Sequence, residues 1–159
     1  MLMKTIKFNF DIVGGIAHVY AIEPANVRSI NTHPITGYSR IAIVANANII
    51  ELPVYAPTAT SFQENHSISK GVDIYDVSIS VEIPRQNDPI ILEELRKGEW
   101  LVIHQDANGD IWMSGTKDIP LRFSTSHMTD NDVNINSGTF SGKEPGASLM
   151  IDRRAFFIE

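Results

Sequence analysis

The histidines are the first residues to consider for chemistry, because a neutral imidazole can bind a metal or transfer a proton near pH 7. They are His18, His33, His66, His104 and His127. No two of them have the spacing of a His-Glu-x-x-His zinc motif, and no carboxylate stands at a zinc-site spacing from any of them. The chain has no cysteine, which excludes thiolate ligands, a thiol nucleophile and disulfides. We therefore expect no metal site and no cofactor.

A second candidate for ion binding is the run Asp-Asn-Asp-Val-Asn at residues 130–134, which imitates the opening of a calcium loop. Oxygen-bearing side chains occupy its positions 1, 3 and 5. Position 6 is Ile135, where the sharp turn of a calcium loop needs glycine, and position 12 is Ser141, where a bidentate glutamate is needed. The pattern instead predicts a turn that leads into a strand.

The carboxylates Asp106 and Asp110 bracket an Asn108-Gly109 turn and stand near Trp112, an arrangement that glycoside chemistry could use. Acidic residues at hairpin ends are also ordinary turn residues, and we favour that interpretation. The chain contains no Gly-x-Ser-x-Gly, no Gly-x-Gly-x-x-Gly and no Walker loop. We therefore predict that the protein is not an enzyme.

The composition is that of an ordinary folded domain. A chain of 159 residues suits a single domain, residues 1–159, because about two-thirds of its unfolded surface can be buried at that size. The net charge of −6 argues against nucleic-acid binding that depends on Lys and Arg neutralising phosphates. The start of the chain alternates polar and apolar residues, and no run of about 18 apolar residues occurs. We expect a cytosolic product without a membrane partner.

The elements that would position any site begin with a long strand over residues 72–84. Apolar side chains alternate there with polar ones, which predicts one buried and one wet face. Val72 and Ile74 lie on the opposite parity, so we expect either a bulge or a strand start that is covered on both sides. The apolar face comprises Tyr75, Val77, Ile79, Val81 and Ile83. The polar face comprises Asp76, Ser78, Ser80 and Glu82.

Further strands are predicted along most of the chain. Residues 16–22 are rich in β-formers, and residues 41–45 and 49–55 have the spacing of a hairpin. The Asn-Gly turn predicts a second hairpin between residues 100–106 and 110–115. Three more candidate strands cover residues 120–124, 133–140 and 148–158.

One short helix is predicted over about residues 89–97. Asp88 suits the N-cap, Pro89 the first helical position and Gly98 the left-handed C′ position. The apolar residues Ile91, Leu92 and Leu95 share a face by their spacing, so the helix should lie on a sheet. The fold class expected is mainly β: a β-sandwich or open barrel with one flanking helix.

The C-terminal half carries a longer pattern. It runs from the alternating strand through the helix ending Arg-Lys-Gly, then Leu-Val-Ile-His-Gln-Asp, the Asn-Gly turn, Ile-Trp-Met-Ser-Gly, Ile-Pro-Leu-Arg-Phe and, at residues 139–145, Thr-Phe-Ser-Gly-Lys-Glu-Pro. Gly14-Gly15-Ile16 followed by Tyr20 extends it towards the N-terminus. This combination resembles prophage structural proteins of gut Bacteroidetes and, more distantly, the tail tube proteins of long-tailed phages.

The resemblance implies a subunit whose copies form rings that stack into a tube through which DNA passes. Its partners would be further copies of itself and other virion proteins, first in the cytoplasm of a bacterial host and then in the virion. We expect the strand of residues 72–83 to join a sheet between subunits, with Tyr75, Val77, Ile79 and Val81 inward. Asp76, Ser78, Ser80 and Glu82 would face solvent or an acidic lumen that repels phosphate.

Two other functions stay open at this point. A carbohydrate- or protein-binding β-module would use an exposed aromatic platform, so Trp100 and Trp112 should not both be buried. An enzyme on a β-barrel would need a pocket with converging polar groups.

Overall fold

The strand β7 (Glu99–Asp106) organises the fold, because both of its faces are buried. Alternate side chains along it enter two separate cores: Trp100 and Val102 belong to one, and Leu101 and Ile103 belong to the other. Such a continuous apolar run is typical of a strand that is covered on both faces. The remaining strands are therefore arranged on two sides of β7.

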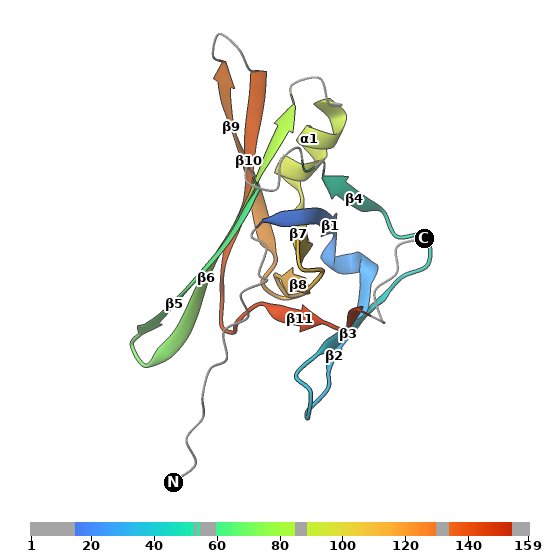
Figure 1. The fold of residues 1–159 in the computed structure, drawn as a ribbon, viewed down its shortest axis with the longest axis vertical. Coiled ribbons are helices and arrows are strands. Elements are labelled where there is room, and N and C mark those ends of the chain that lie inside the picture. The colour runs from blue at the N-terminus through green and yellow to red at the C-terminus, as the bar shows by residue number, and fades with distance from the viewer. Residues whose placement is uncertain (1–14, 53, 55–59, 85–88, 130–133, 154–159) are drawn as a thin grey trace.

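The computed structural model describes residues 15–52, 54, 60–84, 89–129 and 134–153 (Figure 1). Within these residues the chain is mainly β with one α-helix, which confirms the expected fold class. In chain order, the remaining elements are β1 (Ile16–Ile22), the 3-10 helix η1 (Pro24–Asn26), β2 (Val27–Thr32), β3 (Ser39–Ile43), β4 (Ile49–Leu52), β5 (Ser61–Ser69), β6 (Val72–Pro84), α1 (Pro89–Lys97), β8 (Ile111–Ser114), β9 (Leu121–Thr129), β10 (Asn134–Glu144) and β11 (Leu149–Ile151).

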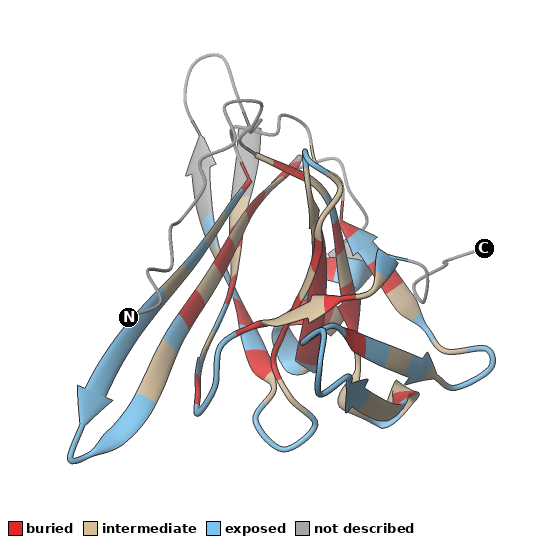
Figure 2. Cartoon of the chain, turned by 60° about the horizontal axis from the view of Figure 1, so that its bottom comes forward, coloured by how far each residue is buried: buried red, intermediate tan, exposed pale blue. Residues whose placement is uncertain are grey.

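The eleven described strands belong to one sheet whose ends do not meet to close a barrel. Hydrogen-bonded neighbours follow the order β2-β3-β11-β8-β7-β9-β10-β6-β5, and β1 pairs with β7 and β4 beside this path. The long strands β5, β6, β9 and β10 form one wall of the molecule, and the shorter strands form the other (Figure 1). Red bands of buried residues on both walls face the interior (Figure 2). Among the described strands, the main path thus ends in β2 and β5, and β4 is a third strand with a free edge because it pairs only with β1.

The predicted hairpin between residues 41–45 and 49–55 is wrong. Both segments contain a strand, but β3 pairs with β2 and β11, whereas β4 pairs with β1. The chain changes direction near Asn46, which has a left-handed φ of 62°. Local spacing predicted the two strands but not their partners. A strand pairs with whichever strand of the folded sheet offers a free edge, which is β1 for β4 and β2 for β3.

Two strands were missed, β2 and β5, and the second matters more. The segment before β6 has mostly polar side chains, and no strand was predicted there. It forms the nine-residue strand β5, which pairs in unbroken register with β6 from Ser61↔Ser80 to Ser69↔Val72. The apolar alternation changes phase at Val72 for neither of the expected reasons. The hairpin has no bulge there, and the start of β6 is not covered on both sides, since Val72 is 58% exposed at the hairpin tip.

The helix α1 confirms the predicted element but corrects its details. Leu92 and Leu95 are buried, whereas Ile91 is 41% exposed and does not belong to the buried face. Gly98 is not left-handed; an added Cβ there would lie 2.5 Å from Cζ2 of Trp100. The Trp100 indole fills this space and donates a 2.9 Å hydrogen bond to the Leu95 carbonyl at the end of the helix. The predicted N-cap, Asp88, lies outside the described residues.

The hairpin around Asn108-Gly109 is confirmed, with β7 and β8 paired from Val102↔Ser114 to Gln105↔Ile111. Gly109 has a φ of 82°, which explains why glycine is needed at that turn. The last three predicted strands correspond to β9, β10 and β11; of the predicted segment 148–158, β11 covers Leu149–Ile151, and residues 154–158 lie outside the described residues.

A close approach in the β9–β10 pair makes Gly138 a sensitive position. An added Cβ would lie 2.3 Å from Cζ of Phe123, whose ring packs 4.7 Å from that of Phe140. Because both rings belong to the core, Gly138→Ala is expected to lower the free energy of unfolding by about 1–3 kcal/mol. Urea unfolding would measure the loss, and an unchanged midpoint would contradict this packing.

Candidate functional site

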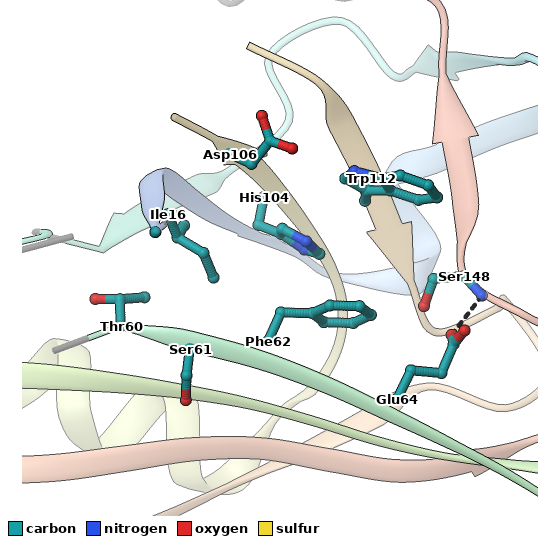
Figure 3. A pocket seen from close by; sticks show the side chains of 10 residues that line it. Ile16, Thr60, Ser61, Phe62, Glu64, His104, Asp106, Trp112 and Ser148 are labelled. Carbon is teal, nitrogen blue, oxygen red and sulfur yellow. Dashed lines mark hydrogen bonds between the residues drawn. The ribbon is translucent and has the colours of Figure 1, made fainter. Parts of the chain in front are cut away.

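A pocket of about 620 Å³ opens between β5 and the shorter strands (Figure 3). Its volume lies within the roughly 300–1,000 Å³ typical of ligand pockets. Its described lining residues are Gly15, Ile16, Thr60, Ser61, Phe62, Glu64, His104, Asp106, Trp112 and Ser148. The lining surface is predominantly apolar, with no Lys or Arg among these residues.

Pairing between strands positions the aromatic part of the pocket. His104 on β7 stands directly opposite Trp112 on β8 in the antiparallel register. Phe62 reaches towards them from β5, and its ring centre lies 4.5 Å from that of His104. Ile16, at the start of β1, lies on the other side of the imidazole (Figure 3). Three separate parts of the chain therefore meet around His104.

His104 is the most perturbed titratable group of the pocket. Its side chain is only 2% exposed, and burial lowers the pKa of its imidazole to about 4, although the Asp106 carboxylate acts in the opposite direction. Its Nδ1 is buried and has no hydrogen-bond partner within the part of the chain that the structure describes. The ring is therefore neutral at physiological pH and forms part of the apolar wall.

The carboxylates of the pocket hold the backbone in place. Glu64 Oε2 on β5 accepts a 2.7 Å hydrogen bond from the Ser148 amide, which ties the end strand to the opposite wall (Figure 3). Asp106 Oδ1 accepts from the amides of Asn108 and Asp110, at 2.9 Å each, and stabilises the turn. The pocket thus combines aromatic walls with two acidic side chains, which favours a neutral or cationic occupant over an anion.

A second buried carboxylate lies behind the pocket. Glu144 is 4% exposed and accepts a 2.8 Å hydrogen bond from the Gly115 amide. Burial raises its pKa, the hydrogen bond from Gly115 opposes that rise, and the nearby Glu64 adds to it. The hydroxyls of Ser114 and Ser148 lie 2.8 Å apart in the same region. This cluster joins the two walls through buried polar contacts.

The residues predicted to form the inter-subunit strand lie on β6. Val77, Ile79 and Val81 are 0–1% exposed within the core of a single chain, and Tyr75 is half-buried. On the other face Asp76 is exposed, whereas Ser78, Ser80 and Glu82 are half-buried. The alternation therefore describes the faces correctly, but the apolar residues are buried against their own chain.

The edges of β6 are also occupied. Between Tyr75 and Ser80 it pairs with β5 on one side and with β10 on the other. That stretch has no free edge for another copy, so the strand that borders the sheet is β5.

Phe62 and Glu64, which line the pocket from β5, were missed for the same reason as the strand itself. The only sequence signal for these two pocket residues is an apolar residue followed two positions later by an acidic one, within a polar run.

Comparisons with known proteins found no matching family model, no matching curated protein and no matching solved structure. Among the described residues, no helix is long and apolar enough to span a membrane. The same residues contain no group of three His, Asp or Glu side chains that could hold a metal ion. Most of the calcium-like run, residues 130–133, lies outside the described part. Function is therefore inferred below from the geometry of the chain itself.

Proposed function

We propose that this chain is a non-catalytic structural subunit that assembles with copies of itself, as a phage or prophage virion protein of the tail-tube type. The observation that carries the proposal is the outer edge of β5. In the described part of the chain β5 is the last strand of the sheet and pairs only with β6. A free strand edge is a template for pairing with a second chain.

The edge of β5 lacks the usual features that prevent such pairing. Monomeric sheets protect long edge strands with proline, lysine, a bulge or a short length. β5 has nine residues, contains no proline or lysine, and keeps an unbroken register. Its single carboxylate, Glu64, points into the pocket towards Ser148 (Figure 3). This absence of protection supports an edge that is covered in an assembly.

The tip of the β5–β6 hairpin adds apolar surface beside this edge. Ile68 is 69% exposed and Val72 is 58% exposed, on either side of a turn made by Lys70 and Gly71, which both have positive φ values. Large exposed side chains of this kind commonly belong to an interface. The register places Ile68 opposite Asp73 and Val72 opposite Ser69, so the two apolar side chains lie on opposite faces of the hairpin, one on each side of the free edge.

The two ends of the sheet differ, which favours a head-to-tail arrangement. β2, at the end opposite β5, carries the exposed Arg28, and its register with β3 shifts between Val27 and Ser29. When different surfaces of identical subunits meet, the contact is heterologous and closes into a ring if the rotation permits. We propose that β5 of one copy lies near the β2 end of the next.

The face of β6 that points away from the core would then line a lumen or the outside of a ring. It presents Ser78 and Ser80 between Asp76 and Glu82, and Lys143 lies 4.0 Å from Asp76. A hydroxyl-rich face whose two carboxylates outnumber its one lysine would bind phosphate weakly, and we propose that this permits DNA to pass.

Lysine on the edge of β5 tests the proposal. Asn65 and Ser67 are exposed, so Asn65→Lys combined with Ser67→Lys should keep the fold and shift the wild-type assembly towards monomer. Lysine on an edge strand is one of the features by which natural sheets prevent pairing with another chain. Light scattering at matched protein concentrations would measure the loss of mass.

A matched control adds the same charge elsewhere. Ser126 and Ser141 are exposed and lie on β9 and β10, inside the path of the sheet and not at its β2 or β5 end, so Ser126→Lys with Ser141→Lys should assemble as the wild type does. If the β5 variant kept the wild-type mass, or if the control lost it equally, the β5 edge would not be the assembly surface.

A second candidate function is the binding module, and Trp112 is the observation that favours it. Trp100 is 1% exposed with its indole N–H bonded to Leu95, so it offers no platform to a ligand. Trp112 is only half-buried and lines the pocket. Binding of a glycan to the monomer with quenching of Trp112 fluorescence would favour this alternative.

A further inference from the structure

The hairpin of β2 and β3 ends in an exposed apolar tip. Ile35 is 88% exposed, the highest value among the large apolar side chains described, and Tyr38 beside it is 44% exposed. An isoleucine this exposed at the end of a projecting hairpin contributes nothing to the core of its own chain. Its apolar surface would be stabilised by contact with another surface.

The tip is also held in one conformation. The imidazole Nδ1 of His33 accepts hydrogen bonds from the amides of Ile35 and Thr36, at 3.3 Å each. The backbone of His33 donates to the Tyr38 carbonyl at 2.8 Å and accepts from the Gly37 amide at 2.9 Å. A preorganised turn loses little entropy on binding, so the exposed side chain is presented at low cost.

The pocket beside β5 is complementary to this projecting tip in shape and in charge. It is concave, lined by Phe62 and Trp112, and carries the carboxylates of Glu64 and Asp106 without a cation among its described lining residues. The hairpin segment, residues 27–43, carries two arginines and no Asp or Glu; Arg40 lies 3.6 Å from Asp152 of its own chain, and Arg28 is exposed. An apolar tip with a positive stem therefore matches an apolar pocket with an acidic lining.

We propose that the β2–β3 tip of one copy inserts Ile35 into the pocket at Phe62 and Trp112 of the next copy. This inference rests on the proposed self-assembly and names the contact that would carry it. The tip contributes no residue to the pocket of its own chain, and the hairpin and β5 belong to opposite ends of the sheet. Each copy thus offers one tip and one pocket, as a head-to-tail ring requires.

Cysteine cross-linking tests the contact cleanly, because the natural chain has no cysteine. Ile35→Cys is mixed with a second variant, Phe62→Cys, whose thiol would stand in the wall of the pocket that the proposal places against residue 35 (Figure 3). Docking raises the effective thiol concentration, so the mixture should form disulfide-linked dimers at least about tenfold faster than a control mixture. The control pairs Ile35→Cys with Asp118→Cys in an exposed loop.

A second variant, Ile35→Asp, separates the contact from the assembly itself. Its exposed position leaves the fold intact, so its thermal unfolding should match the wild type while the assembled mass falls. Equal cross-linking in both mixtures, together with wild-type mass for Ile35→Asp, would overturn the insertion and leave self-assembly in place. A wild-type chain that stays monomeric at every concentration would overturn both proposals.

Discussion

Replacing Val77 and Ile79 together by aspartate is expected to unfold the chain, not to yield a folded monomer that merely fails to assemble. Both side chains are 0% exposed and belong to the core between the two walls. Burying an unpaired carboxylate costs several kcal/mol, and two such costs approach the whole stability of a domain, about 5–15 kcal/mol. Circular dichroism should show no cooperative thermal transition.

The opposite face of the same strand supplies the control. Ser78→Asp with Ser80→Asp adds the same two charges at half-buried positions that point away from the core. That variant should keep a cooperative transition, although with a lower midpoint. A cooperative transition near the wild-type midpoint in the Val77/Ile79 variant would contradict the burial of these residues within one chain.

Acid is expected to destabilise the fold through His104. Burial lowers its pKa to about 4 in the folded chain, from 6.5 for a free imidazole. Above pH 6.5 the ring is neutral in both states, so it contributes no pH dependence there. Between pH 6.5 and 4 only the unfolded chain binds the proton, so stability falls as pH falls. The full loss is about 3 kcal/mol, at 1.36 kcal/mol for each pH unit.

The variant His104→Phe isolates this contribution. Its denaturant midpoint, measured from pH 7.5 to 4, should depend on pH less steeply than that of the wild type. Glu144 acts in the opposite direction, because its raised pKa favours the folded state in acid, and the comparison of the two proteins cancels it. Equal slopes for wild type and His104→Phe would contradict a buried neutral imidazole.

The parts of the fold that follow from sequence are those set by local signals. The alternation of residues 72–84, the Asn108-Gly109 turn and the helix over residues 89–97 all correspond to observed elements. The pairing of β3 and β4 was wrong, because partners are chosen by free edges far along the chain. Glycine at position 98 was predicted from a left-handed φ, whereas the space for a side chain there is filled by the Trp100 ring. Sequence spacing cannot indicate such a contact.

The candidate site could not be predicted, because it depends on a strand that lacks a local signal. β5 is polar along most of its length and gains its place from pairing with β6. Once it is in place, Phe62 meets His104, and Glu64 meets Ser148, a residue 84 positions away. The sequence showed His104 as one of five scattered histidines, and its burial distinguishes it from the exposed His18, His33 and His66.

The most direct test of self-assembly is the particle mass of the wild-type chain across protein concentration, measured by light scattering with negative-stain images of the most concentrated sample. We expect the mass to rise above that of the monomer and the images to show rings or tubes. A strict monomer up to millimolar concentration would contradict the proposed function.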